Sequence, residues 1–177
     1  MHTISPERQA VLEVLNKARS MELYSILQYM DQHYVLDSQD YGLFADDIKR
    51  IAIDEMRHAE KFAERIRELE GEPTQSVEGV VSKGQELKKI FPFDADIEVN
   101  VLDTYNRFAM ICLENNDALS AHLFRTILME EQEHHRWFTD QHSHIERLGD
   151  IYLARHAGTE GGLRTSTMGF TAHPEND

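Results

Sequence analysis

The chain has 177 residues, of which 41% are hydrophobic and 28% charged, as expected for one globular domain with a substantial core. Its 32 acidic and 18 basic side chains give a formal net charge of −14, which argues against binding to nucleic acid. The sequence has no secretion signal and no apolar run near the ~20 residues of a membrane span. A single cysteine, Cys112, excludes an internal disulfide. We therefore expect a cytoplasmic protein without membrane or nucleic-acid partners.

Hydrophobic residues recur three or four positions apart in the first half of the chain, which predicts two long helices. The Ser-Pro-Glu sequence at residues 5–7 supplies the cap, proline and acid that are typical of a helix start. A break at residues 36–40 ends this helix, and Asp40 is placed to cap the next one. Residues 72–85 show no helical period and are interpreted as a connection that is long enough to run the length of a bundle.

The second half of the chain shows the same helical pattern again. A third helix is clear from about Asp94, but its start is left open because Pro92 would kink or end a helix. The Asn-Asn-Asp sequence at residues 115–117 indicates a turn into a fourth helix. Residues 151–156 are then expected to form a short fifth helix.

Four amphipathic helices with two short turns and one long link predict an all-α fold. The expected architecture is an antiparallel four-helix bundle with one long crossover and a short fifth helix. We assign residues 1–157 to this bundle and residues 158–177 to a C-terminal tail rich in Gly, Thr and Ser. The tail is expected to be extended or mobile, and no role is assigned to it.

One spacing occurs twice within these helices. Each copy is a glutamate followed 33 positions later by Glu-x-x-His, with a tyrosine seven positions after the first glutamate. A repeat of this length predicts two related helical hairpins. The six motif residues are Glu22, Glu55 and His58 in the first copy and Glu98, Glu131 and His134 in the second.

The geometry of a hairpin predicts that the six motif residues meet. Residues equidistant from a turn face each other, and the paired glutamates have midpoints at 38.5 and 114.5, inside the two expected turns. All four glutamates lie on apolar stripes, where unpaired carboxylates are too costly to bury. One Glu-x-x-His alone is an ordinary surface pair, but two copies on core stripes predict a site for two metal ions. Mixed oxygen and nitrogen ligands suit iron or manganese.

The sequence resembles the ferritin-like di-iron proteins and, within them, the bacterioferritins. The resemblance covers residues 8–157 and is carried by the six motif residues, by residues 22–29 and 54–60, and by Trp137. It implies that Glu22 and Glu98 are terminal ligands, that Glu55 and Glu131 bridge two irons, and that His58 and His134 complete one iron each.

The resemblance also implies a function, namely an iron-storage ferroxidase. Two iron ions per subunit would bind, Fe(II) would be oxidised by O₂ or H₂O₂, and the ferric product would be stored as a mineral inside a shell of 24 subunits. A ferredoxin- or rubredoxin-type electron donor would release the iron. The sequence leaves the oxidant and the donor open.

Met56 is the residue that predicts a second cofactor. It lies about 100° around the helix from Glu55 and therefore faces away from the expected metal centre. The resemblance implies that a methionine here, from each of two subunits, binds a haem shared between them. Without the resemblance, packing in a haem-free dimer interface is the simpler interpretation. The first helix adds an apolar face that needs a cover, most simply another subunit, formed by Leu23, Ile26, Leu27 and Met30.

Several other residues near the motifs are given less specific roles. Tyr29 and Tyr105 are expected to bond ligand carboxylates, to supply an electron, or only to pack in the core. Asp54 and Glu130 precede the motif glutamates, where an acid could help iron to reach or leave the centre, but the simpler interpretation is that both are solvated. Cys112 is interpreted as a core residue.

Two alternative functions stay open at this point. The first is a non-storage di-iron or di-manganese peroxidase or catalase of the ferritin-like superfamily. Rubrerythrins carry a four-cysteine iron domain that one cysteine cannot supply, so only a cysteine-free relative or a manganese catalase fits. The second is a haem-binding helical dimer for electron transfer, which would leave the four core glutamates unexplained.

Overall fold

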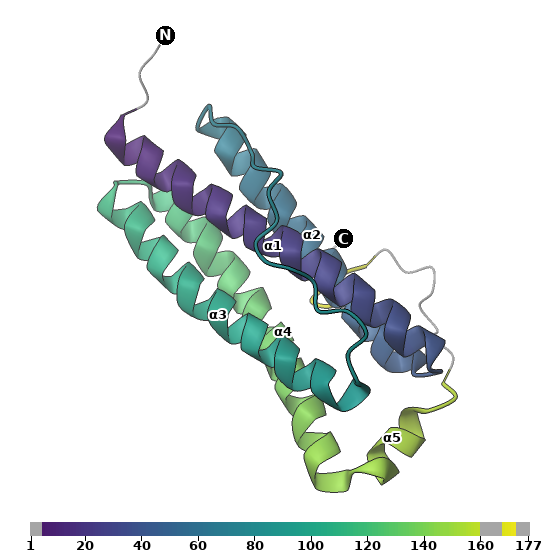
Figure 1. The fold of residues 1–177 in the computed structure, drawn as a ribbon. Helices are drawn as coiled ribbons and strands as arrows, with labels where there is room; N and C mark the ends of the chain where they lie inside the picture. Colours follow the sequence, from purple (N-terminus) through teal and green to yellow (C-terminus); the bar gives the residue numbers. More distant parts are fainter. Residues whose placement is uncertain (1–4, 160–167, 173–177) are drawn as a thin grey trace.

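Four long helices and one short helix are present in the computed structural model, which describes residues 5–159 and 168–172. The helices α1 and α2 form one antiparallel hairpin, and α3 and α4 form a second one beside it (Figure 1). This arrangement confirms the all-α four-helix bundle with one long crossover and a short fifth helix. The bounds are α1 (Pro6–Ser38), α2 (Gly42–Glu68), α3 (Leu87–Glu114), α4 (Ala118–Leu148) and α5 (Asp150–His156).

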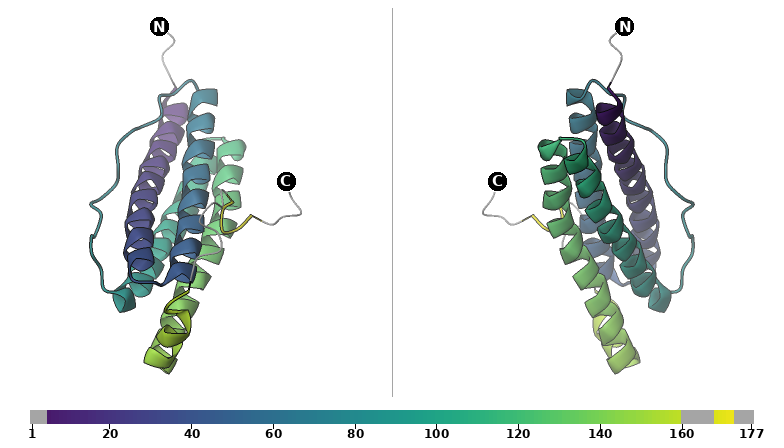
Figure 2. Two further views of the ribbon diagram at one scale, coloured as in Figure 1. Left: turned by 90° about the vertical axis from the view of Figure 1, so that its right-hand side faces the viewer. Right: turned by 90° about the vertical axis from the view of Figure 1, so that its left-hand side faces the viewer.

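The crossover between α2 and α3 runs back along the outside of α1 (Figure 2). The backbone N–H of Glu78 donates a hydrogen bond of 2.9 Å to the carbonyl of Ser20. Farther along, the N–H of Ser82 donates a bond of 2.8 Å to Oε1 of Gln28. These bonds attach the connection to α1. Because the connection runs back along the bundle, α2 and α3 run in the same direction.

The start of α3 lies earlier than the sequence indicated. The helix begins at Leu87 and contains Pro92, whereas the sequence pattern indicated a clear helix only from about Asp94. Pro92 is the sixth residue of the helix, so it removes one backbone hydrogen bond that another residue there would donate within the helix. Ile90 and Phe91 are fully buried, and their packing outweighs the lost bond.

The helix caps are partly as expected. Ser5 accepts a first-turn backbone N–H through Oγ at 3.3 Å, which confirms it as the cap of α1. Asp117 caps α4 in the same way, with a bond of 2.9 Å from the N–H of Ser120. Asp40 does not cap α2, because its φ of 62° places it in the turn and Tyr41 takes the cap position.

Two hydrophobic clusters fill the bundle, one on either side of a buried polar layer. Phe62 and Tyr105 belong to the first cluster, and Tyr29 and Phe138 belong to the second. All four side chains are fully buried, as is Cys112. The polar layer between the clusters contains the six motif residues. No helix in the described part of the chain combines the length and apolar character of a membrane span.

Candidate metal centre

The structure brings the six motif residues together in the middle of the bundle. Each of the six side chains is at most 1% exposed, although all carry ionisable groups. One helix of each hairpin supplies a single glutamate and the other supplies a Glu-x-x-His pair. The contributions are Glu22 from α1, Glu55 and His58 from α2, Glu98 from α3, and Glu131 and His134 from α4.

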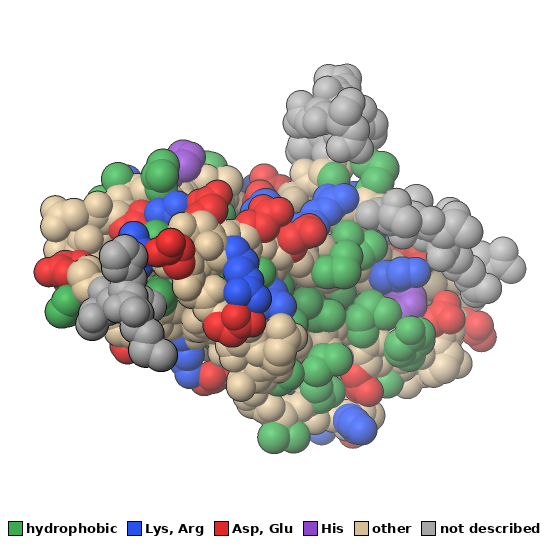
Figure 3. All heavy atoms as spheres, turned by 90° about the horizontal axis from the view of Figure 1, so that it is seen from above, with side chains coloured by type: hydrophobic (Ala, Val, Ile, Leu, Met, Phe, Trp, Pro, Cys, Tyr) green, Lys and Arg blue, Asp and Glu red, His purple; other side chains and the backbone are tan. Residues whose placement is uncertain are grey.

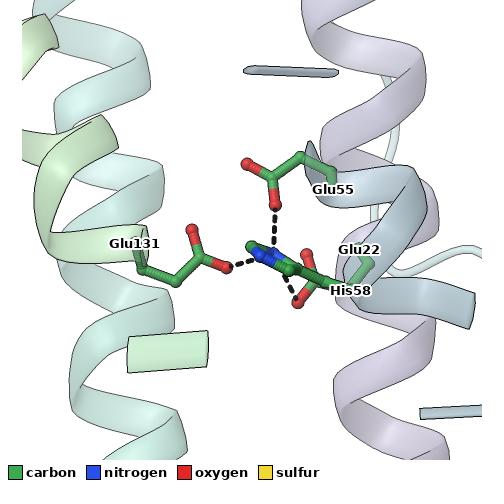
Figure 4. A group of neighbouring side chains, drawn as sticks. All are labelled: Glu22, Glu55, His58 and Glu131. Atoms are coloured by element: carbon green, nitrogen blue, oxygen red, sulfur yellow. Dashed lines mark hydrogen bonds and ion pairs between the residues drawn. The ribbon is translucent and has the colours of Figure 1, made fainter. Parts of the chain in front are cut away.

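The six motif residues form two overlapping sets of four. Within each set, one possible ligand atom from every residue lies within 4.8 Å of the others. Glu55 and Glu131 belong to both sets, whereas each remaining residue belongs to one. The first set is Glu22, Glu55, His58 and Glu131, and the second is Glu55, Glu98, Glu131 and His134. Figure 4 shows the first set, with its side chains directed at one another from both hairpins.

Each shared carboxylate presents one oxygen to each histidine. His58 Nδ1 lies 3.0 Å from Glu55 Oε2 and 3.0 Å from Glu131 Oε1. His134 Nδ1 lies 3.1 Å from Glu131 Oε2 and 3.1 Å from Glu55 Oε1. A carboxylate that bridges two cations needs this division of its oxygens, one to each side.

Three carboxylate oxygens in the centre are buried without a hydrogen-bond donor. They are Oε2 of Glu22, Oε1 of Glu55 and Oε1 of Glu131. Glu55 Oε1 and Glu131 Oε1 are close to a histidine nitrogen, but the geometry does not make a hydrogen bond. An ionised carboxylate without a partner is costly to bury. These atoms therefore match a site that a cation completes.

The outer glutamates of the two sets have raised pKa values. Burial is the largest cause for both Glu22 and Glu98, because it disfavours the ionised carboxylate. The negative charges of Glu131 and Glu55 raise both pKa values further. Burial and the neighbouring charges therefore favour the protonated form of Glu22 and Glu98.

The histidines also have raised pKa values. Burial alone would lower the pKa of His58 and of His134, but carboxylates that contact them outweigh it and raise both values well above the usual one. Burial would raise the pKa of Glu131, but the two histidines outweigh it and lower that pKa. The surrounding carboxylates thus favour positive charge at the positions of His58 and His134.

Two tyrosines connect the hairpins at this level. Tyr29 on α1 donates a hydrogen bond of 2.5 Å from its hydroxyl to Glu98 Oε1 on α3. Tyr105 on α3 donates a hydrogen bond to Glu22 Oε1 on α1. Of the roles considered from the sequence, hydrogen bonding to the motif carboxylates is therefore observed.

The acids before the motif glutamates are not simply solvated, contrary to the sequence interpretation. Asp54 is 1% exposed, and its Oδ2 lies 3.3 Å from His134 Nε2. The Glu130 side chain is 27% exposed, and its Oε2 lies 2.8 Å from His58 Nε2. Each acid thus reaches the histidine of the other hairpin. The signal in the sequence was that both motif copies have an acid at this position.

Met56 lies on the other side of α2, with 55% of the residue exposed. It lines a surface groove, and Leu27 on the neighbouring face of α1 is 49% exposed. Figure 3 shows the molecule from above relative to Figure 1, and hydrophobic side chains gather on the right-hand half of this face. The other residues that line the groove are Arg19, Leu23, Ile26, Ala59, Glu60 and Ala63.

Comparison with known proteins decides the family. The ferritin-like domain family matches residues 12–148. A bacterioferritin of Desulfovibrio desulfuricans is 53% identical over 165 residues, which are 93% of this chain and 92% of that protein. This chain belongs to the bacterioferritin family. The bacterioferritin BfrA of Mycobacterium tuberculosis is 33% identical over 146 residues, which are 82% of this chain and 92% of that protein.

Solved bacterioferritin structures have the same fold. The Desulfovibrio desulfuricans bacterioferritin, described with a diiron site in different catalytic states, has a TM-score of 0.90 and 49% identity, and the match covers 96% of this chain and 99% of that one. Mycobacterium tuberculosis BfrA has a TM-score of 0.80 and 32% identity, with 86% and 95% covered. In the bacterioferritin chain described here, α2 directs Glu55 into the bundle and Met56 out of it.

Proposed function

We propose that this bacterioferritin is an iron-storage ferroxidase whose six motif residues bind two iron ions. The observation that carries the proposal is the pair of shared carboxylates, each with one oxygen toward each histidine. The diiron site of the Desulfovibrio desulfuricans structure supports the choice of metal. Fe(II) is the substrate, O₂ or H₂O₂ the oxidant, and a stored ferric mineral the product.

The residues of the centre fit two iron ions. Glu22 and His58 would hold one ion, and Glu98 and His134 the other, while the shared glutamates would contact both. Carboxylate oxygen and imidazole nitrogen are ligands that iron accepts in both of its common oxidation states. Two bound Fe(II) ions supply one electron each to the oxidant.

The surrounding side chains orient the ligands. Tyr105 donates to Oε1 of Glu22, which leaves Oε2 of that carboxylate free for a metal ion. Glu130 and Asp54 contact Nε2 of the two histidines. This contact holds each ring with Nδ1 toward the carboxylates, because an Nε2–H bonded to an acid leaves Nδ1 as the free nitrogen of a neutral imidazole.

We also propose that the protein assembles as a 24-subunit shell of haem-bridged dimers. The support is the exposed apolar face of α1 and α2, with Met56 lining the groove on it. A thioether sulfur is a suitable axial ligand for haem iron, and apolar side chains favour a porphyrin face. A ferredoxin- or rubredoxin-type electron donor and a cytoplasmic location stay predictions.

The ferroxidase proposal is tested by replacing both shared ligands. Glu55→Ala with Glu131→Ala removes the two bridging carboxylates, and we expect Fe(II) oxidation, followed by absorbance of the ferric product, to fall to the rate without protein. The matched control is Glu64→Ala with Glu133→Ala, because both of those glutamates are exposed on the same two helices. Oxidation by the first variant at the rate of the control would contradict the proposal.

Metal analysis and size-exclusion chromatography separate storage from the alternative chemistry. A particle with the mass of 24 chains that contains iron and shows a haem absorption band supports the storage shell. A dimer that contains manganese and shows no haem band supports the peroxidase or catalase alternative instead, since manganese accepts the same ligand set.

A further inference from the structure

The described part of the C-terminal tail, residues 168–172, returns to the metal centre. Thr171 donates two hydrogen bonds to Asp54 Oδ2, one of 2.8 Å from its backbone N–H and one of 3.0 Å from its hydroxyl. The same oxygen lies 3.3 Å from His134 Nε2. Thr171 is thus joined to a motif histidine through one carboxylate oxygen. Figure 2 shows this segment beside α2 and α4.

The close approach of this segment depends on a glycine. A Cβ added at Gly169 would lie 1.6 Å from Oδ1 of Asp54 and 2.6 Å from its Cγ. Any other residue there would force either the segment or the Asp54 carboxylate to move, which would disturb the contact between them. With this segment in contact, Asp54 is 1% exposed although it carries an ionisable carboxylate.

Phe170 anchors the segment between these two contacts. Its backbone N–H donates a bond of 3.1 Å to the carbonyl of Arg50, and the Arg50 guanidinium lies 5.4 Å from the centre of its ring. The ring also packs at 5.7 Å from Trp137 and 6.1 Å from His134, measured between ring centroids. The segment thus combines backbone bonds, a cation–π contact and apolar packing.

The opposite side of the centre is built differently. Glu130, which contacts His58 as Asp54 contacts His134, is paired with Lys61 at 3.2 Å, and its side chain is 27% exposed. The two halves of the centre are therefore equivalent in their six motif residues and unequal in what covers them. On the His58 side, the outer acid Glu130 is paired with Lys61 at the surface. On the His134 side, the outer acid Asp54 is covered by residues 168–172.

We propose that residues 168–172 form a cap over the His134 half of the centre, in which Thr171 is a positioning residue. It fixes Asp54 as the acceptor for His134 Nε2–H, so that His134 Nδ1 is held toward the shared carboxylates. The metal position that includes His134 then binds its ion more tightly than it would without the cap. The position that includes His58 does not depend on the cap. This inference rests on the proposed metal centre.

Two shortened chains test the cap. One lacks residues 168–177, and its matched control lacks only residues 173–177. Anaerobic titration with Co(II), followed by visible absorption, measures both metal positions without any reaction with oxygen. We expect one of the two dissociation constants to rise about tenfold in the shorter chain, as is usual when the partner of a ligand histidine is disturbed. The control should keep both constants of the full chain.

A pair of point variants separates positioning from general stability. Thr171→Val removes the hydroxyl donor and keeps the backbone N–H, so we expect one Co(II) constant to weaken about threefold. Thr171→Ser keeps the hydroxyl and should restore the parental value. Fluorescence of Trp137, the single tryptophan of the chain, reports in the same samples whether Phe170 still packs on it.

The outcomes distinguish the cap from the metal centre. A full chain that binds two Co(II) ions, with both constants unchanged or equally weakened by loss of residues 168–177, would overturn the cap. A full chain that binds Co(II) no better than the Glu55→Ala, Glu131→Ala variant would overturn the metal centre, and the cap with it.

Discussion

The hydroxyl of Tyr29 on α1 donates a hydrogen bond of 2.5 Å to Glu98 on α3, so a residue of one hairpin holds a motif carboxylate of the other. Tyr105 does the same in the reverse direction, for Glu22. The two bonds lie on either side of the shared glutamates. They connect the hairpins through fully buried polar groups, where the loss of one partner is costly.

Tyr29→Phe should destabilise the metal-free protein. The change leaves Glu98 Oε1 buried without its donor, so we expect the free energy of unfolding to fall by about 1–3 kcal/mol in denaturant titrations. Tyr34→Phe is the matched control, because Tyr34 lies on the same helix and is 63% exposed. It should change stability by less than about 0.5 kcal/mol. Equal effects of the two changes would show that the bond to Glu98 contributes nothing.

The stability of the metal-free protein should fall as the pH rises above neutrality. His58 and His134 have an ordinary pKa of 6.5, and contacting carboxylates outweigh burial to raise it well above that value in the fold. Their stabilisation is therefore complete below pH 6.5 and is lost as the pH rises through the raised values. Thermal unfolding at about pH 7 and about pH 9 measures the difference. A melting temperature that rises over this range would contradict the assigned protonation.

Binding of a divalent ion should release protons from the centre. Burial raises the pKa of Glu22 and Glu98, so these carboxyls, together with the two histidines, hold protons that a bound cation displaces. Calorimetric titration with Co(II) in buffers of different ionisation enthalpy counts the protons released. We expect release per ion to be positive and affinity to increase with pH. Binding without proton release would show that the metal-free centre is already ionised.

Met56→Leu should abolish the haem absorption band of the purified protein. Leucine keeps the apolar groove but lacks the sulfur that would bind the haem iron. Met110→Leu is the control, since Met110 on α3 is 54% exposed and lies outside the groove. The expected result is a band in the control and none in the Met56 variant. A haem band of parental intensity in Met56→Leu would exclude Met56 as the ligand.

Glu130→Gln should weaken metal binding at the His58 half of the centre. Glutamine keeps the size of the side chain, but it removes the charge that contacts His58 Nε2 at 2.8 Å. We expect one Co(II) dissociation constant to rise about tenfold. Glu133→Gln, at an exposed position on the same helix, should leave both constants at their parental values. Parental binding by the Glu130 variant would show that this acid does not position His58.

The sequence predicted that the six motif residues would meet because their spacing follows the period of the helix and is repeated in the two hairpins. The spacing from Glu22 to Glu55, and the matching spacing in the second copy, depends only on helix geometry and on the position of each turn. The positions of the turns and the spacing of the motifs were therefore enough to predict that the six motif residues converge. Their role as metal ligands stays a prediction.

The features that the sequence did not predict depend on tertiary contacts that leave no repeated pattern in the sequence. Asp54 looks like any surface acid until residues 168–172 are placed on it, 117 positions away in the chain. The start of α3 was obscured by Pro92, whose local cost is visible in the sequence, while the burial of Phe91 that outweighs it is not. Helix periodicity and turn signals therefore predicted the helices and the repeated motif. They could not predict contacts that occur once and join residues far apart in the sequence.

Because Glu55 and Glu131 belong to both ligand sets, metal binding would affect how firmly the two hairpins are held together. Neither ligand set can be assembled from one hairpin, because the first set takes Glu131 from α4 and the second takes Glu55 from α2. Each bound ion would therefore act as a cross-link between hairpins that are joined covalently only by the crossover. Amide hydrogen exchange in the middle of α2 and α4 should slow as the centre fills, so the stiffness of each subunit would report how much metal it holds.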